Sequence, residues 1–250
     1  RHNAVDVLST VKRITSLAGI EERRSNYSDD LNHIQLSITR WLKDESVLEK
    51  CASIAPEQLE AAGDNISASV YGRLKVIGEN PDMCEKLIIA ETTHPAHALA
   101  ALFLLKITGN VVGHAGSHID LTTLSESVRD LMGLGNMMET LLENDTYRSH
   151  VASRGRVIAM IAKSDTTRQD GRGEAEYAQY EACVDVYRVV EKMRRKYPEL
   201  EDVKASVMNG GGEALQRGGG RVTEIAAIHG RAAADARVTD CGPSTLTIQG

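Results

Sequence analysis

The sequence predicts an α/β fold that is predominantly helical and contains a partial (β/α) barrel. Short, continuous apolar runs such as LIIA (87–90) and VIAMIA (157–162) alternate with longer segments of helical period. Uninterrupted apolar strands of this length are typical of a parallel sheet that is buried on both faces. We count about four strand–helix units, whereas a closed barrel needs eight. Either the other half is missing or another chain completes the barrel.

Residues 1–84 are predicted to form a helical segment that packs on the barrel. In the first helix, Val5, Leu8 and Val11 begin a series of apolar residues at intervals of three and four, and Gly19 is a plausible stop. A second helix is expected over 30–44, and a third over 56–77.

Residues 85–250 are predicted to form the partial β/α barrel with a glycine-rich anion loop. The run 87–90 precedes a helix over 95–107, the run 157–162 precedes a long helix over 173–196, and 205–208 precedes the glycines. A further strand is expected near 119–124. Strand and helix in repeated alternation are the signature of α/β winding.

Composition excludes several classes of function. The formal net charge of −6 argues against a nucleic-acid partner, which usually requires a basic domain. No apolar run is long enough to span a membrane, and no signal peptide is visible. The four cysteines are widely scattered, which predicts reduced thiols and a cytoplasmic protein. The phosphate loop ending in GK[ST] is absent, so we expect no nucleotide cofactor.

Polar residues at the ends of the predicted strands are the candidate site. Glu91, Glu126, Asp165 and Asn209 each follow a strand, and working residues of such folds lie at the carboxyl ends of strands. Two carboxylates beside a glycine-rich loop on one rim are suited to a hard cation and an anion. The alternative is that the acidic residues only cap the helices that follow.

Other polar clusters receive structural interpretations. His94 and His97 flank Pro95 at a predicted helix start, which favours capping or solvent exposure over metal ligation. The basic run 192–196 ends the long helix, where cations complement the helix dipole. We interpret it as a solvated helix end.

Six segments occur in the same order as in a known family. They are the opening RHNAVDVLSTVKRITSLAGI, then EKLIIAETTHPAHALAALFLLKITG, ESVRDLMGLGNMMETLLENDTYR, MIAKSDTTRQDGR, MNGGGEALQRGGGR and the final TLTIQG. Together they resemble the phosphoenolpyruvate carboxylase superfamily over nearly the whole chain. The resemblance implies a degenerate, partial-length relative whose fold corresponds to the central part of that enzyme's barrel.

The resemblance places some functional residues of the family on this chain. The metal carboxylates fall on Glu126 and Asp165, which implies Mg²⁺ as a cofactor. The second arginine of the glycine loop falls on Arg217. The catalytic histidine and the first arginine of that loop fall on Asn209 and Gly211, so both are lost.

Two more replacements lie beside Asp165. The family's tyrosine before this aspartate is Lys163, and the lysine after it is Arg168. These cations are expected either to pair with Asp165 or to hold the anionic end of a substrate.

The lost histidine argues against carboxylation, because asparagine cannot exchange a proton near neutral pH. We favour an enzyme, a lyase or transferase of biosynthetic (natural-product) metabolism that acts at a C–O bond with loss or transfer of phosphate or sulfate. The residues expected to act in catalysis are Asn209, Arg217 and Lys163; those expected to bind an anionic small-molecule substrate are Gly210, Gly211, Gly212, Arg217, Arg168 and Glu91.

Two alternatives remain open from the sequence. The chain is either a non-catalytic subunit that binds a partner or regulatory anion, or a fragment of a carboxylase. For the enzyme and for the non-catalytic subunit we expect a second protein chain, because a pocket built from four strand–helix units lacks some of its walls.

Overall fold

The structure is a computed structural model that describes residues 2–20, 30–111, 117–162, 171–210, 222–238 and 245–246. Its centre is a six-stranded sheet in which every neighbouring pair is parallel and strand order follows chain order. The strands are β1 (His2–Asn3), β2 (Lys86–Ala90), β3 (Asp120–Ser125), β4 (Arg156–Ile161), β5 (Lys204–Asn209) and β6 (Thr245–Leu246). Consecutive parallel neighbours joined by helical crossovers are the repeating unit of a β/α barrel, so the predicted fold class is confirmed.

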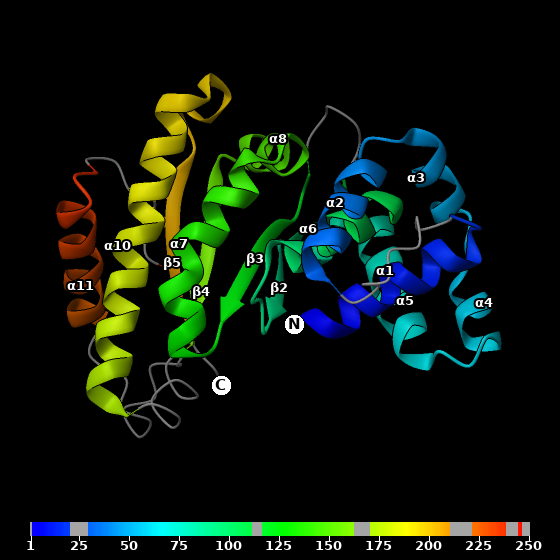
Figure 1. Cartoon of the computed structure of the whole chain (residues 1–250), viewed down its shortest axis with the longest axis horizontal. Helices are drawn as coiled ribbons and strands as arrows, with labels where there is room; N and C mark the ends of the chain where they lie inside the picture. Colours follow the sequence, from blue (N-terminus) through cyan, green and yellow to red (C-terminus); the bar gives the residue numbers. More distant parts are fainter. Residues whose placement is uncertain are drawn as a thin grey trace.

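Helices connect the strands of the sheet, and five of the described helices lie between β1 and β2. The helices are α1 (Ala4–Leu17), α2 (Leu31–Trp41), α3 (Glu45–Ala52), α4 (Pro56–Ala61), α5 (Asn65–Glu79), α6 (Pro95–Ile107), α7 (Val128–Glu143), α8 (Asp145–Arg154), α10 (Arg172–Lys196) and α11 (Val222–Asp235). Short 3₁₀ turns occupy Pro81–Met83 and Pro198–Leu200. Figure 1 shows α7, α10 and α11 side by side along one part of the strands, with α1 to α5 grouped at the other end of the molecule.

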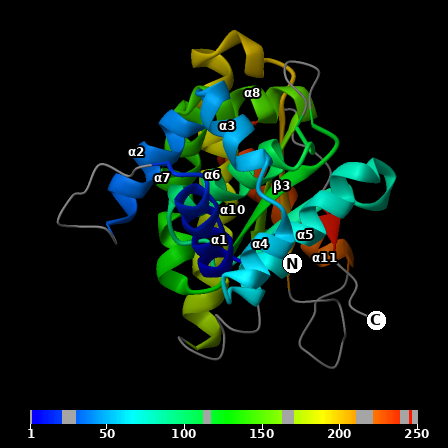
Figure 2. The same cartoon turned by 90° about the vertical axis from the view of Figure 1, so that its right-hand side faces the viewer.

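The helix α6 joins the N-terminal helices to the sheet. It contacts α1, α2, α3 and α5 as well as β2 and β3, and Figure 2 shows the N-terminal helices in front of it. Apart from Lys106, all of its residues are buried. A helix that is apolar on every side needs such complete enclosure. One continuous hydrophobic cluster therefore runs from α1 through α6 to α10.

The strands are buried on both faces, as their apolar runs predict. In β4, Val157, Ala159 and Ile161 pack into the main core, which the helices cover. The alternate residues Ile158 and Met160 belong to a second cluster on the opposite face, with Ala90, Leu124, Ala162 and Met208. Because side chains alternate along a strand, these two clusters occupy the two faces of one sheet.

Two predicted helices have different boundaries. The helix expected over 30–44 ends at Trp41, and Asp44 then caps a separate helix, α3, by accepting hydrogen bonds from Ser46 and Val47. The helix expected over 56–77 is two helices. Gly63 takes a left-handed conformation (φ 79°) between them, and the carboxylate of Asp64 caps the second.

The strand count is also larger than predicted. The strand near 119–124 is confirmed as β3, but β1 and β6 extend the sheet at its two sides with two residues each. Within the described residues, no helix has the length and apolar character needed to cross a membrane.

Candidate functional site

The carboxyl ends of four strands meet at one rim of the sheet, and the structure brings predicted site residues together there. The backbone N–H of Glu91, just after β2, donates to Oε2 of Glu126, just after β3, at 2.9 Å. Asn3, at the end of β1, donates from Nδ2 to Oε2 of Glu91 at 2.6 Å. The side chain of Asn3 was not predicted as part of this rim. It also caps α1, because its Oδ1 accepts from the N–H of Val5.

Glu91 has a strained backbone. Its φ is 55°, in the left-handed region that costs a non-glycine residue about 1–2 kcal/mol. The next residue fixes this turn: Thr92 donates from its N–H to Leu124 O at 3.0 Å and from its hydroxyl to Ile89 O at 2.8 Å. Strained residues held by their surroundings cluster at functional sites, so Glu91 stays a candidate residue of this rim.

Asn209 contacts a histidine that sequence reasoning missed. Its Nδ2 lies 3.1 Å from Nε2 of His229, which α11 supplies from beyond the glycine-rich stretch. When the amide donates to Nε2, the ring carries its proton on Nδ1. His229 is 3% exposed, and this burial lowers its pKa. A neutral imidazole therefore stands beside the residue that replaces the expected histidine.

Gly210 begins the glycine-rich stretch in close contact with β4. Its N–H donates to Ile161 O at 2.7 Å. A Cβ added at Gly210 would lie 3.1 Å from Cε of Met160 and 3.2 Å from the same carbonyl oxygen. Only glycine allows this approach without displacement of a neighbour. The other predicted residues of the site, Lys163, Asp165, Arg168, Gly211, Gly212 and Arg217, lie outside the described residues.

The rim has donors of the kind that a hard cation prefers. Glu91 and Glu126 supply carboxylate oxygens, which suit Mg²⁺. One oxygen of each already accepts a hydrogen bond. Within the described ranges, no group of three or more histidine, cysteine, aspartate or glutamate side chains is arranged to hold a metal. The donor type fits; the predicted metal ligands are Glu126 and Asp165, and Asp165 lies outside the described residues.

The two histidines at the start of α6 have structural roles. His94 caps the helix through Nδ1, which accepts from Ala96 N–H at 3.1 Å, so the predicted capping is confirmed. His97 is buried, which corrects the expectation of exposure. Its Nδ1 accepts from Thr93 N–H at 3.3 Å, and burial lowers its pKa to about 4, with a smaller contribution from His94.

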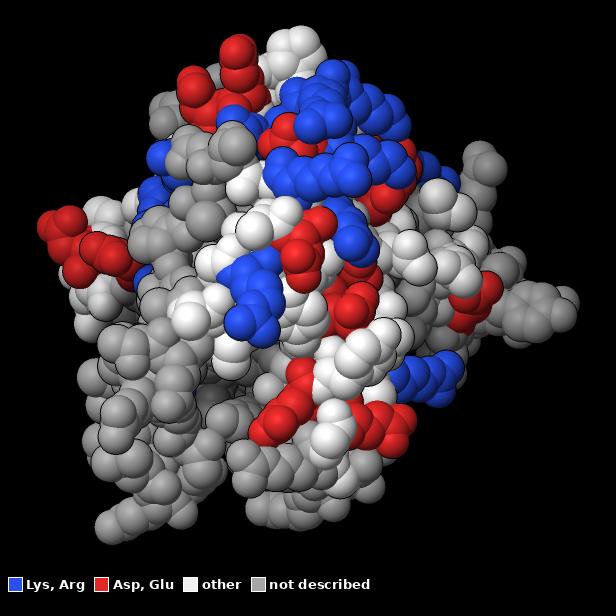
Figure 3. All heavy atoms as spheres, turned by 90° about the vertical axis from the view of Figure 1, so that its left-hand side faces the viewer, with Lys and Arg blue, Asp and Glu red and all other residues white. Residues whose placement is uncertain are grey.

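The basic end of α10 is neutralised by neighbouring carboxylates. Lys192 pairs with Glu139 at 2.6 Å, and Lys196 pairs with Glu143 at 2.7 Å. Arg195 pairs with Glu191 within the same helix at 3.0 Å. Figure 3 shows this mixture of basic and acidic side chains near the top of the face. The prediction of a solvated helix end agrees with these exposed contacts, but their pairing with carboxylates was not predicted.

Comparison with known proteins decides the family. The family model described as phosphoenolpyruvate carboxylase matches residues 9–240. The chain belongs to the phosphoenolpyruvate carboxylase family. It is 29% identical over 182 residues to the phosphoenolpyruvate carboxylase of Tolumonas auensis, covering 71% of this chain and 19% of that protein. It is 25% identical over 213 residues to that of Hahella chejuensis, covering 82% and 22%.

The chain spans about a fifth of the length of these curated relatives. A third relative, the phosphoenolpyruvate carboxylase of Aeromonas hydrophila, is 32% identical over 161 residues, covering 60% of this chain and 18% of that protein. Membership of the phosphoenolpyruvate carboxylase family agrees with the partial β/α barrel. Family membership alone does not show which reaction this chain catalyses; that depends on its site residues.

Proposed function

We propose that this chain is an enzyme subunit that binds an anionic small molecule at the strand-end rim and catalyses a non-carboxylating step at a C–O bond. The observation that carries the proposal is Asn209, which stands where the resemblance expects a catalytic histidine and directs its amide to His229. An amide orients a substrate but does not relay a proton. Departure of phosphate or sulfate depends mainly on stabilising the charge that develops on the leaving group.

The proposed roles follow from side-chain charge. Arg217, Lys163 and Arg168 hold the anion, together with the backbone N–H groups of Gly211 and Gly212, because the N–H of Gly210 already donates to Ile161 O. Asn209 orients the reacting group, and its contact with His229 fixes the rotamer of the amide. On the opposite side of the rim, Glu91 with its Asn3 partner binds the polar part of the substrate.

Glu126 and Asp165 are proposed to hold Mg²⁺. When bound, the ion supplies positive charge beside the leaving group. The backbone N–H of Glu91 orients the carboxylate of Glu126 at 2.9 Å. This contact keeps one oxygen of Glu126 fixed and supports its role as a ligand.

We also propose that a second protein chain completes the site and that the pair works in the cytoplasm. The outermost strands β1 and β6 have two residues each, and edges of a parallel sheet are normally covered or paired. Burial raises the pKa of the Cys51 and Cys183 thiols to about 11 and about 12, which keeps them protonated and unreactive.

The reaction is tested with phosphoenolpyruvate, with and without bicarbonate, on the purified chain and on the chain isolated with any co-purifying protein. We expect release of inorganic phosphate or tight binding without formation of oxaloacetate. Glu126→Gln should abolish Mg²⁺-dependent phosphate release, whereas Glu139→Gln, a carboxylate of α7 paired with Lys192, should not. Bicarbonate-dependent oxaloacetate formation at a rate near that of a related carboxylase would contradict the proposal.

One observation favours a second candidate. Coverage of only a fifth of the relatives' length is also what a fragment of a carboxylase would show. Light scattering and the activity of the isolated chain separate the candidates. An active monomer of 27.2 kDa contradicts the need for a partner, and oxaloacetate formation after addition of the missing segments of a relative supports the fragment. A non-catalytic subunit would bind a second chain and release no phosphate.

A further inference from the structure

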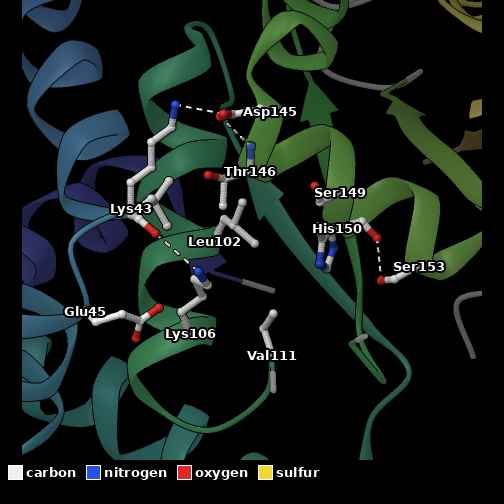
Figure 4. Close-up of a pocket in the computed structure, with 11 residues that line it drawn as sticks. Lys43, Glu45, Leu102, Lys106, Val111, Asp145, Thr146, Ser149, His150 and Ser153 are labelled. Atoms are coloured by element: carbon white, nitrogen blue, oxygen red, sulfur yellow. Dashed lines mark hydrogen bonds and ion pairs between the residues drawn. The ribbon is translucent and has the colours of Figure 1, made fainter. Parts of the chain in front are cut away.

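A cavity of about 410 Å³ lies away from the strand-end rim, between the turn after α2, the last part of α6, and α8. The crossover helix α6 returns the chain from the carboxyl end of β2 to the amino end of β3, so its last turn lies at the opposite end of the barrel from Glu91. Figure 4 shows the side chains around this space. Those that matter here are Lys43, Leu102, Lys106, Asp145, Thr146 and His150.

His150 is the unusual member of the cavity wall. It is 5% exposed, and within the described residues neither ring nitrogen has a hydrogen-bond partner. Its main-chain carbonyl accepts from Ser153 Oγ at 2.7 Å, but that contact leaves the ring free. Buried polar groups nearly always have a partner, so two unpartnered nitrogens in a cavity wall point to a missing one.

The ring of His150 is neutral near pH 7. Burial lowers its pKa to about 4, and the charge of Arg154 contributes further, against a smaller opposite effect of Asp120. A neutral imidazole offers one N–H donor and one acceptor. It can therefore donate to an anion without itself bringing a buried charge into the cavity.

Positive charge is available beside this ring. Lys106 is partly buried, and its one side-chain hydrogen bond within the described residues goes to Leu42 O at 3.2 Å. An ammonium group has three donors, so two remain for a ligand. Lys43 and Asp145 form an ion pair of 2.8 Å at the solvent-exposed edge of the cavity. The exposed Glu45 is the other carboxylate of the lining, in the first turn of α3, where a negative charge suits the helix dipole.

We propose that this cavity binds a small oxyanion, a carboxylate or phosphate group, between Lys106 and His150. The Lys106 ammonium and the imidazole N–H donate to its oxygens, and the Thr146 hydroxyl lies on the same wall. The apolar side chains of Leu42, Leu102 and Val111 exclude water around these bonds and strengthen them. The cavity has the volume of an ordinary small-molecule site. This site is separate from the strand-end rim and does not rest on its function.

The test is calorimetric titration of the whole chain with inorganic phosphate and, separately, with succinate, at an ionic strength matched with potassium chloride. We expect at least one probe to bind with a stoichiometry of one at this site. Lys106→Met and His150→Leu should each weaken that binding about tenfold or more, as expected when a hydrogen bond to a charged group is lost. Lys192→Met removes a lysine of α10 instead and should leave the affinity unchanged.

Two further measurements keep the outcome decisive. His150→Gln retains one donor and one acceptor, and should bind more tightly than His150→Leu. In the wild-type chain, the NMR signals of the His150 ring should shift on titration with the probe that binds. Phosphate and succinate distinguish the two sources of the oxyanion. Absence of binding by both probes, or binding that Lys106→Met and His150→Leu leave intact, overturns the proposal.

Discussion

Asp120→Asn should be among the most destabilising single changes of one polar side chain for another in this protein. The aspartate begins β3 and is 2% exposed. One carboxylate oxygen lies 2.7 Å from Nε of Arg154, and the other lies 2.5 Å from Nη2 of Arg156. Arg154 also donates from Nη1 to Ser117 O at 2.8 Å, which fixes its guanidinium in place. The asparagine has nearly the same shape but leaves two guanidinium groups without their anion.

The size of the effect follows from burial. Removing one member of a buried pair costs about 3–5 kcal/mol. Arg154 and Arg156 keep 20% and 39% of their side chains exposed, so water partly screens them and we expect a loss of about 2–4 kcal/mol. For a chain of this length, that loss lowers the melting temperature by roughly 5–15 °C.

The assay is thermal unfolding followed by circular dichroism at pH 7, beside Glu139→Gln as the control. Glu139 pairs with the exposed Lys192 at 2.6 Å, and breaking an exposed pair costs less than about 1 kcal/mol. If the two variants melt at the same temperature, burial does not determine the strength of the Asp120 ion pairs, and the reasoning fails.

Three other predictions test separate features. Gly78→Ala should destabilise the fold by about 1–3 kcal/mol, because the new Cβ would lie 2.1 Å from Thr108 O. Gly133→Ala should instead stabilise helix α7 by up to about 1 kcal/mol, because its new Cβ meets nothing within 4 Å. Denaturant unfolding measures both changes. Glu91→Gly should melt at a higher temperature than Glu91→Ala. Both variants lose the carboxylate, but only alanine keeps the strain of the left-handed backbone, which is worth about 1 kcal/mol. The reverse order of melting temperatures would contradict that strain. Wild-type stability should fall as the pH drops from about 6.5 to 4, since the folded-state pKa of His150 is lowered to about 4 and only the unfolded state takes up a proton in that window. In His150→Leu, the change in unfolding free energy across this pH window should be smaller by up to about 3 kcal/mol. An unchanged pH dependence would refute the lowered pKa of His150.

The strands of the sheet differed in how well the sequence predicted them. The strands β2, β4 and β5 have continuous apolar runs, because both of their faces are buried. The strand β3 carries threonines on both faces, so its sequence has no continuous apolar run. The two-residue strands β1 and β6 have no run at all. Their pairing depends on where neighbouring strands lie, and that information is not local to the sequence.

The site was predicted in position but not in its contacts. Glu91 and Glu126 each follow a predicted strand, so their placement at one rim follows from parallel strands alone. The contacts of Asn209 with His229 and of Asn3 with Glu91 join residues 20 and 88 positions apart. No motif connects these pairs, because the packing of α11 and the register of β1 bring them together.

The two ends of the barrel are built from different interactions, and this determines what a substitution changes. At the strand-end rim, exposed hydrogen bonds such as Asn3 to Glu91 hold the side chains, and each contributes only about 0.5–1.5 kcal/mol to stability. At the opposite end, the buried carboxylate of Asp120 holds Arg154, the last residue of α8, and Arg156, the first residue of β4. Substitutions at the rim can therefore change binding and chemistry while the fold persists. The asparagine at position 209, where the resemblance places a histidine, is the kind of change that this division of roles permits in a chain that keeps the family's fold.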